Sequence, residues 1–185
     1  MADFAEDEEP MRFGARHLGR ALANEHLDPA LERAMTPERM EAHAMRRVDE
    51  MGVRLKVKRR SALDPARAIA GPNTIHLPVG FRRAPARNRA ALLMHELLHV
   101  RQWRQAGAIP MAARYAFAPR WRAAYEIEAH AESFRAHGSM GWTRRDALGW
   151  RTVYITRVHK TYFLRRVDFN EFAQLCARAW KVPER

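Results

Sequence analysis

Residues 92–102, LLMHELLHVRQ, combine side chains that can bind a metal ion with one that can move a proton. His95 and His99 are four positions apart, so in a helix both rings lie on one face and can direct a nitrogen to one ion about 2 Å away. Glu96 lies about 100° further round the helix, within reach of a water on that ion. The spacing predicts two metal ligands and a general base. A third ligand must come from elsewhere, because catalytic zinc usually has three protein ligands.

A second group of candidates lies in YEIEAHAES, beginning at Tyr125. Glu126 and Glu128 are about 200° apart on a helix, so only one of them can face the metal. We expect Glu126 to be the third ligand, because Ala129 lets the two helices approach closely, and Glu128 is the alternative. His130, one turn after Glu126, is expected to orient a ligand or to donate a hydrogen bond to a developing oxyanion. The alternative is a histidine of the helix surface.

These two stretches resemble the motifs of the gluzincin metallopeptidases, in particular the small members called minigluzincins, which carry H-E-x-x-H on one helix and E-x-x-A-[D/N/H] on the next. HELLHVRQ is also similar to the H-E-x-x-H-x-x-Q stretch of zincin domains in phage-like and contractile-injection gene clusters. The resemblance covers about residues 53–138. It implies a zincin-like fold that holds Zn²⁺ and hydrolyses peptide bonds.

In that family the two histidines and the downstream glutamate bind zinc, which here implies His95, His99 and Glu126 as ligands. The glutamate of the motif, Glu96, would then assist the attack of a zinc-activated water on the peptide carbonyl. Larger gluzincins take the oxyanion donor from a C-terminal subdomain. In this chain the candidates are His130, Tyr115 and His159, in that order. Tyr125 is a further candidate, although tyrosines near a core more often serve packing.

The elements that must position these residues indicate an α+β fold, mostly helical, with a small edge sheet before the active-site helix. Prolines at the expected starts and glycines after the expected ends predict helices over 37–51, 86–106 and 119–138, and a further one over 26–35. VRLKVKRR alternates like a half-exposed strand, and GPNTIHLPVGF predicts a strand at the sheet edge, because Pro78 cannot donate to a ladder. This edge, Ile75 to Pro78, would pair with an extended peptide. AIPMAARYAFA predicts a connector, and the two stretches after residue 142 predict weaker helices.

Three segments follow from these assignments. Residues 1–11 predict an acidic disordered leader. Residues 12–138 predict the zincin-like metallopeptidase domain, with N-terminal helices over 12–51 and the metal core over 53–138. Residues 139–185 predict a basic helical C-terminal extension.

Charge and cysteine content restrict the compartment and the partners. The chain has 33 Lys and Arg against 21 Asp and Glu, which gives a net charge of +12. This charge favours acidic proteins, nucleic acid or lipid headgroups as partners. The alternative is that a GC-rich genome has raised the arginine content without selecting a partner. Cys176 is the only cysteine, so no intrachain disulfide is possible and a metal must use nitrogen and oxygen ligands. Neither a signal peptide nor a membrane span is predicted. We expect a protein of the cytoplasm or of a virion or injection apparatus.

Three functions remain open at this point. The first is a zinc metallopeptidase acting on a peptide or protein substrate. The second is a non-catalytic zincin-fold component that assembles with phage-like structural proteins. The third is a basic nucleic-acid-binding module, because residues 138–185 hold ten basic and four acidic residues with aromatic residues between them. The spacing of those aromatic residues also fits a helix face buried on the domain.

Overall fold

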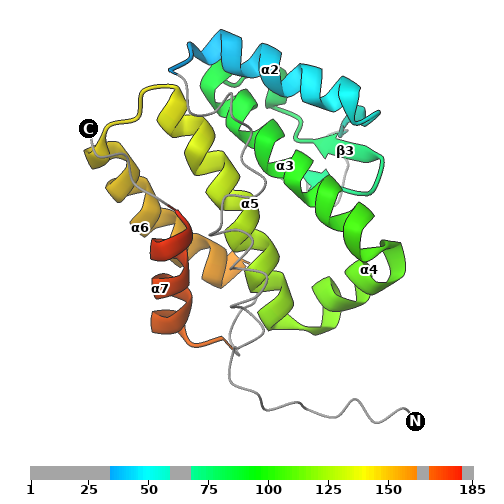
Figure 1. Cartoon of the computed structure of the whole chain (residues 1–185), viewed down its shortest axis with the longest axis vertical. Helices are drawn as coiled ribbons and strands as arrows, with labels where there is room; N and C mark the ends of the chain where they lie inside the picture. Colours follow the sequence, from blue (N-terminus) through cyan, green and yellow to red (C-terminus); the bar gives the residue numbers. More distant parts are fainter. Residues whose placement is uncertain (1–33, 59–67, 162–166, 181–185) are drawn as a thin grey trace.

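The structure, a computed structural model, describes residues 34–58, 68–161 and 167–180. This part of the chain is mostly helical with one small sheet, as an α+β fold requires. Figure 1 shows α3 between α2 and α5, with α6 and α7 beyond α5. The helices are α2 (Pro37–Glu50), α3 (Ala86–Ala106), α4 (Ala108–Phe117), α5 (Pro119–Ser139), α6 (Arg144–Thr161) and α7 (Phe169–Ala179), and a 3₁₀ turn η2 covers Phe81–Arg83. The predicted leader and the predicted helix over 26–35 lie outside the described residues, except for positions 34 and 35.

The helix boundaries follow the local punctuation of the sequence. The Thr36 hydroxyl accepts a hydrogen bond from the Arg39 amide at 3.3 Å and so caps α2, which has proline in its first turn. Helix α3 ends at Gly107, whose φ of 82° is a conformation that other residues rarely adopt. Helix α5 begins at Pro119, as expected. The predictions over 37–51, 86–106 and 119–138 are therefore confirmed to within a residue.

The prediction of a connector at AIPMAARYAFA is wrong, because residues 108–117 form helix α4. Pro110 is the third residue of that helix, where a backbone N–H has no partner within the helix and its absence costs nothing. Gly107 turns the chain directly from α3 into α4. The polypeptide therefore needs no loop at this corner.

The sheet contains β1 (Arg54–Val57), β2 (Ile69–Ala70) and β3 (Thr74–Leu77) in the order β1-β3-β2. Strand β3 pairs in parallel with β1 and antiparallel with β2, so the expectation that Ile75 to Pro78 lie at the sheet edge is wrong. Pro78 follows the last residue of β3 and removes no ladder hydrogen bond. The edges are β1 and the two-residue β2, which is too short to show a periodicity in the sequence.

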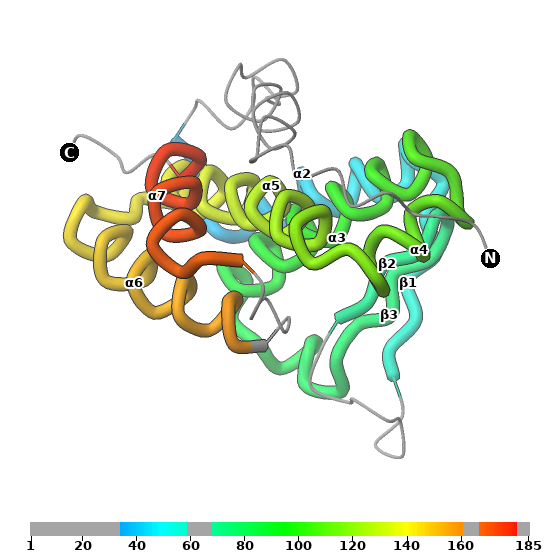
Figure 2. Tube along the Cα trace, turned by 90° about the horizontal axis from the view of Figure 1, so that it is seen from below, coloured from blue at the N-terminus to red at the C-terminus, as the bar shows by residue number. Residues whose placement is uncertain are grey.

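Two hydrophobic clusters hold the helices together. The first joins α2, the sheet and α3, with Met40, Ile75 and Leu93 at its fully buried centre. The second joins α5 to α6 and α7 around Phe172 and Trp180, and the Trp180 Nε1–H donates to the Ile127 carbonyl at 2.8 Å. Helices α6 and α7 therefore pack directly on α5, as Figure 2 shows from a second direction. The three-segment division of the chain stays a prediction.

Helix α3 is buried on nearly every side between α2, the sheet and α5. Leu93, Leu97 and Val100 form the buried face that the sequence predicts. The opposite face, which carries His95 and His99, is also buried, because α5 covers it. A polar face hidden under a second helix requires partners for its nitrogen atoms, and α5 supplies them.

Candidate metal centre

Four side chains that can bind a metal meet where α3 crosses α5. Helix α3 supplies His95 and His99, and α5 supplies Glu126 and His130. The His95 and His99 Nε2 atoms are 3.1 Å apart, and they lie 3.8 Å and 3.5 Å from the Glu126 carboxylate oxygens. The His130 Nε2 lies 3.9 Å from the same carboxylate. All four residues are buried, and Glu126 has no exposed surface.

The geometry of this cluster fits a small divalent ion. Two ligands of a tetrahedral zinc ion, each about 2.0–2.1 Å from the metal, are about 3.3 Å apart. The separations among His95, His99 and Glu126 bracket that value. A second grouping, His95, Glu126 and His130, also has ligand atoms within 4.8 Å of one another. The spacing of His95, His99 and Glu126 therefore suits a zinc ion, and the group of His95, Glu126 and His130 could also hold a metal ion if its ligand atoms moved closer together.

A buried glutamine fixes the orientation of one of these rings. The Gln102 Oε1 accepts from the His99 Nδ1–H at 2.7 Å, while its Nε2 donates to Glu128 at 2.7 Å and to the Tyr125 carbonyl at 3.2 Å. Because the Nδ1 of His99 carries the proton, its Nε2 presents a lone pair to the cluster. This arrangement separates the two glutamates of α5. Glu126 faces the histidines, and Glu128 supports Gln102 from outside.

Burial shifts the pKa values of His95, His130 and Glu96. Burial lowers the pKa of His95 well below its ordinary value, and burial lowers that of His130 to about 3, so both rings are neutral, as metal ligands must be. Burial raises the pKa of Glu96 to about 7, and the Glu126 carboxylate also raises it while His99 opposes the shift. A carboxyl group with that pKa can both accept and return a proton near neutral pH.

The predicted oxyanion donors lie in different places. The Tyr115 hydroxyl donates to Glu126, so it orients the carboxylate. Tyr125 is buried, and its ring contacts Trp121. His159 hydrogen-bonds the Val167 carbonyl at 2.9 Å, at the junction of α6 and α7. His130 is buried in the cluster, with its ring centroid 4.4 Å from that of His95, and so is not a residue of the helix surface.

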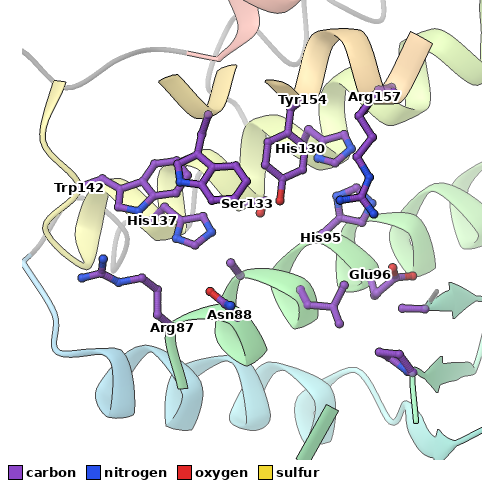
Figure 3. A pocket seen from close by; sticks show the side chains of 16 residues that line it. Arg87, Asn88, His95, Glu96, His130, Ser133, His137, Trp142, Tyr154 and Arg157 are labelled. Carbon is purple, nitrogen blue, oxygen red and sulfur yellow. The ribbon is translucent and has the colours of Figure 1, made fainter. Parts of the chain in front are cut away.

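A cleft of about 650 Å³ opens beside His95 and Glu96 (Figure 3). Three helices form most of its walls, each presenting residues at helical spacing, and Ala68 and Pro78 next to the sheet complete them. The helical residues include Arg87, Ala91 and His95 on α3, His130, Ser133 and His137 on α5, and Trp150, Tyr154 and Val158 on α6. The cluster is thus reached from the cleft at His95 and His130.

Helix α6 contributes to this cleft in a way that the sequence does not predict. The Tyr154 hydroxyl and the Arg157 guanidinium both point toward the space next to His95 (Figure 3). Their spacing with Trp150 follows one helical stripe, which is the signal that was available. The sequence predicts core packing or nucleic-acid binding for the aromatic residues of this region, because nothing in it indicates that α6 folds back onto α5.

No family model, curated protein or solved structure matches this chain. Within the described ranges, every helix is too short or too polar to cross a membrane.

Proposed function

We propose that this chain is a zinc-dependent metallopeptidase. The observation that carries the proposal is the convergence of His95, His99 and Glu126 from two helices beside the buried Glu96, at the wall of an open cleft. Two imidazoles and a carboxylate are a ligand set that catalytic zinc uses in proteins. A cleft next to it is what a hydrolytic site requires and a purely structural site does not.

Held by His95, His99 and Glu126, a zinc ion would act as a Lewis acid that polarises a peptide carbonyl and lowers the pKa of its bound water toward ~7. Glu96 takes one proton from the attacking water as its oxygen bonds to the carbonyl carbon. The same carboxyl group then delivers the proton to the nitrogen atom of the breaking C–N bond. The raised pKa of Glu96 suits both steps.

Tyr154 is the oxyanion donor in this proposal. Its ring lies 5.1 Å from that of His130, and its hydroxyl points into the cleft (Figure 3). Burial raises the pKa of Tyr154, so the hydroxyl keeps its proton at neutral pH and can donate it in a hydrogen bond. His130 then serves as a positioning residue beside His95.

An extended peptide would lie along β2, the sheet edge nearest the cleft. Ala68, which precedes β2, lines the cleft, and Ile69 has 53% of its surface exposed. The outer edge of a sheet can pair with a further strand of backbone. Peptide or protein is therefore the proposed substrate.

The proposal is tested by zinc content and peptide hydrolysis in the purified protein. Wild type is expected to hold one zinc ion per chain and to cleave members of a random peptide library. His99→Ala is expected to lose the zinc, whereas Glu96→Gln is expected to keep it and to lose activity by roughly 10²–10⁴-fold. Glu126→Gln and Glu128→Gln form a matched pair, in which only the first is expected to weaken zinc binding. Absence of stoichiometric zinc in the wild type contradicts the proposal.

One observation favours a second function, a zincin fold that holds zinc without turnover. His130 lies close enough to Glu126 to act as a fourth protein ligand, which would close the site to water. His130→Ala separates the two functions. If His130 only positions His95, as in the peptidase, this substitution lowers the zinc affinity by about 10–100-fold at most, whereas a four-ligand structural site loses a direct ligand and more than about 100-fold.

A further inference from the structure

The end of the cleft remote from the metal cluster carries an arginine held in a fixed position. Arg87, in the first turn of α3, donates from Nη2 to the Met140 carbonyl at 2.8 Å, beyond the end of α5. A guanidinium has five N–H donors, so this bond anchors the group at the cleft wall and leaves further donors available to a ligand. Figure 3 shows Arg87, His137 and Trp142 lying at the same end of the cleft.

Stacked aromatic rings form the wall of the cleft at this end. The Trp142 ring stacks on His137 with centroids 3.9 Å apart and an interplanar angle of 6°. Trp150 lies parallel to Trp142, with centroids 6.2 Å apart. His137 is 7% exposed, and burial together with the Arg87 charge lowers its pKa to about 4. The ring is therefore neutral, and Arg87 supplies the positive charge.

No carboxylate of the cleft wall neutralises this arginine. Among the described residues that line the cleft, Glu96 is the only acid, and it lies at the other end. Asp146 is near enough for its charge to interact with Arg87, but its Oδ2 is engaged by the Thr143 amide at 3.0 Å and hydroxyl at 2.7 Å. A half-buried guanidinium beside flat rings matches a planar anion that enters the cleft, because it can form paired N–H···O bonds with both oxygens.

We propose that Arg87, with the wall formed by His137 and Trp142, is the subsite that recognises a carboxylate of the peptide substrate. This inference rests on the proposed peptidase function and gives it a specificity. His130 and His137 are seven residues apart on α5, so they lie on one face about 10 Å apart. An extended peptide advances about 3.3–3.6 Å per residue. The carboxylate therefore belongs to the third residue from the scissile bond.

The carboxylate can come from an Asp or Glu side chain or from the C-terminus of a short peptide. Two comparisons distinguish these sources. The first compares peptides with Glu or Gln at the third position on either side of the scissile bond. The second compares the same peptides with a free or an amidated C-terminus. Binding is measured by tryptophan fluorescence on zinc-loaded Glu96→Gln protein, because this variant is expected to bind without cleaving. Hydrolysis of the same peptides is measured on the wild type.

We expect the peptide with the correctly placed carboxylate to bind about tenfold or more tightly than its neutral counterpart, as a charged hydrogen-bonded pair requires. Arg87→Gln is expected to remove this difference, and Arg87→Lys to retain part of it, because lysine keeps the charge without the paired geometry. Arg82→Gln is the matched control, since it removes the same charge from an exposed position outside the cleft lining. Its preference is expected to equal that of the parent protein.

Equal binding of charged and neutral peptides by the parent protein overturns the inference. A preference that Arg87→Gln leaves unchanged, with the variant folded by circular dichroism, overturns it as well. Hydrolysis without any charge preference leaves the peptidase proposal standing and removes the subsite alone. Preferential binding without hydrolysis by the wild type supports the subsite and contradicts the peptidase.

Discussion

Replacing Gln102 with leucine is expected to weaken zinc binding about 10–100-fold. Gln102 is 4% exposed and is the acceptor for the His99 Nδ1–H at 2.7 Å. Leucine has nearly the same volume but no acceptor, so the ring of His99 loses the bond that fixes its orientation and its tautomer. A loss of 10–100-fold in affinity corresponds to about 1.4–2.7 kcal/mol.

The same substitution is expected to destabilise the metal-free protein. The His99 Nδ1–H and the Tyr125 carbonyl both lose a partner in a buried site. An unsatisfied buried donor costs about 1–3 kcal/mol, and this cost adds to the lost hydrogen bonds. Urea unfolding of the metal-free protein measures it, while competition with a chromophoric chelator measures the zinc affinity.

This substitution also separates the two possible ligand sets, because Gln102 contacts His99 but neither His95 nor His130. Glu128→Gln is the control, since its side chain can still accept from Gln102 and leaves the bond to His99 intact. We expect that control to bind zinc within about twofold of the wild type. If Gln102→Leu also binds zinc as tightly as the wild type, His99 is not a ligand and the ion belongs to the set that includes His130.

Three further predictions test the fold and its electrostatics. The stability that the neutral His137 contributes is fully present above pH 6.5 and is lost as the pH falls toward about 4, because the ring takes up a proton more readily in the unfolded chain. Urea unfolding of the metal-free protein measures this loss. Between pH 7 and pH 4.5, the free energy of unfolding should fall by about 2–3 kcal/mol less in His137→Gln than in the wild type. Trp180→Ala should cost about 3–5 kcal/mol, since its fully buried ring joins α7 to α5, and a loss below 1 kcal/mol would show that α7 is not docked. Gly107→Ala should lower the free energy of unfolding by about 1–3 kcal/mol, because the φ of residue 107 is 82°. Gly149 lies inside α6 with open space around it, so Gly149→Ala should raise the free energy of unfolding by about 0.5–1 kcal/mol and with it the melting temperature. Equal effects of the two glycine substitutions would contradict the backbone assignment.

Local rules account for most of the helices and for part of the candidate site. The spacing of His95 and His99 places them on one helix face whatever surrounds the helix. The proline at position 37 and the glycine at position 107 mark helix ends, because their backbone preferences are intrinsic. The same rules failed where the signal was short or ambiguous. Pro110 suggested a loop although it occupies a first turn, and a two-residue strand leaves no period to detect.

The turn of an α-helix sets the angles between side chains, so the order of residues alone pairs His95 with His99 and allows only one of Glu126 and Glu128 to join them. Only the tertiary structure decided which glutamate faces the pair, since that depends on how α5 is rotated against α3 and on the hydrogen bond between Gln102 and Glu128. It also decided that α6 folds back to complete the cleft. Contacts between residues far apart in the chain depend on the packing of whole helix faces, and no local pattern of residues encodes them.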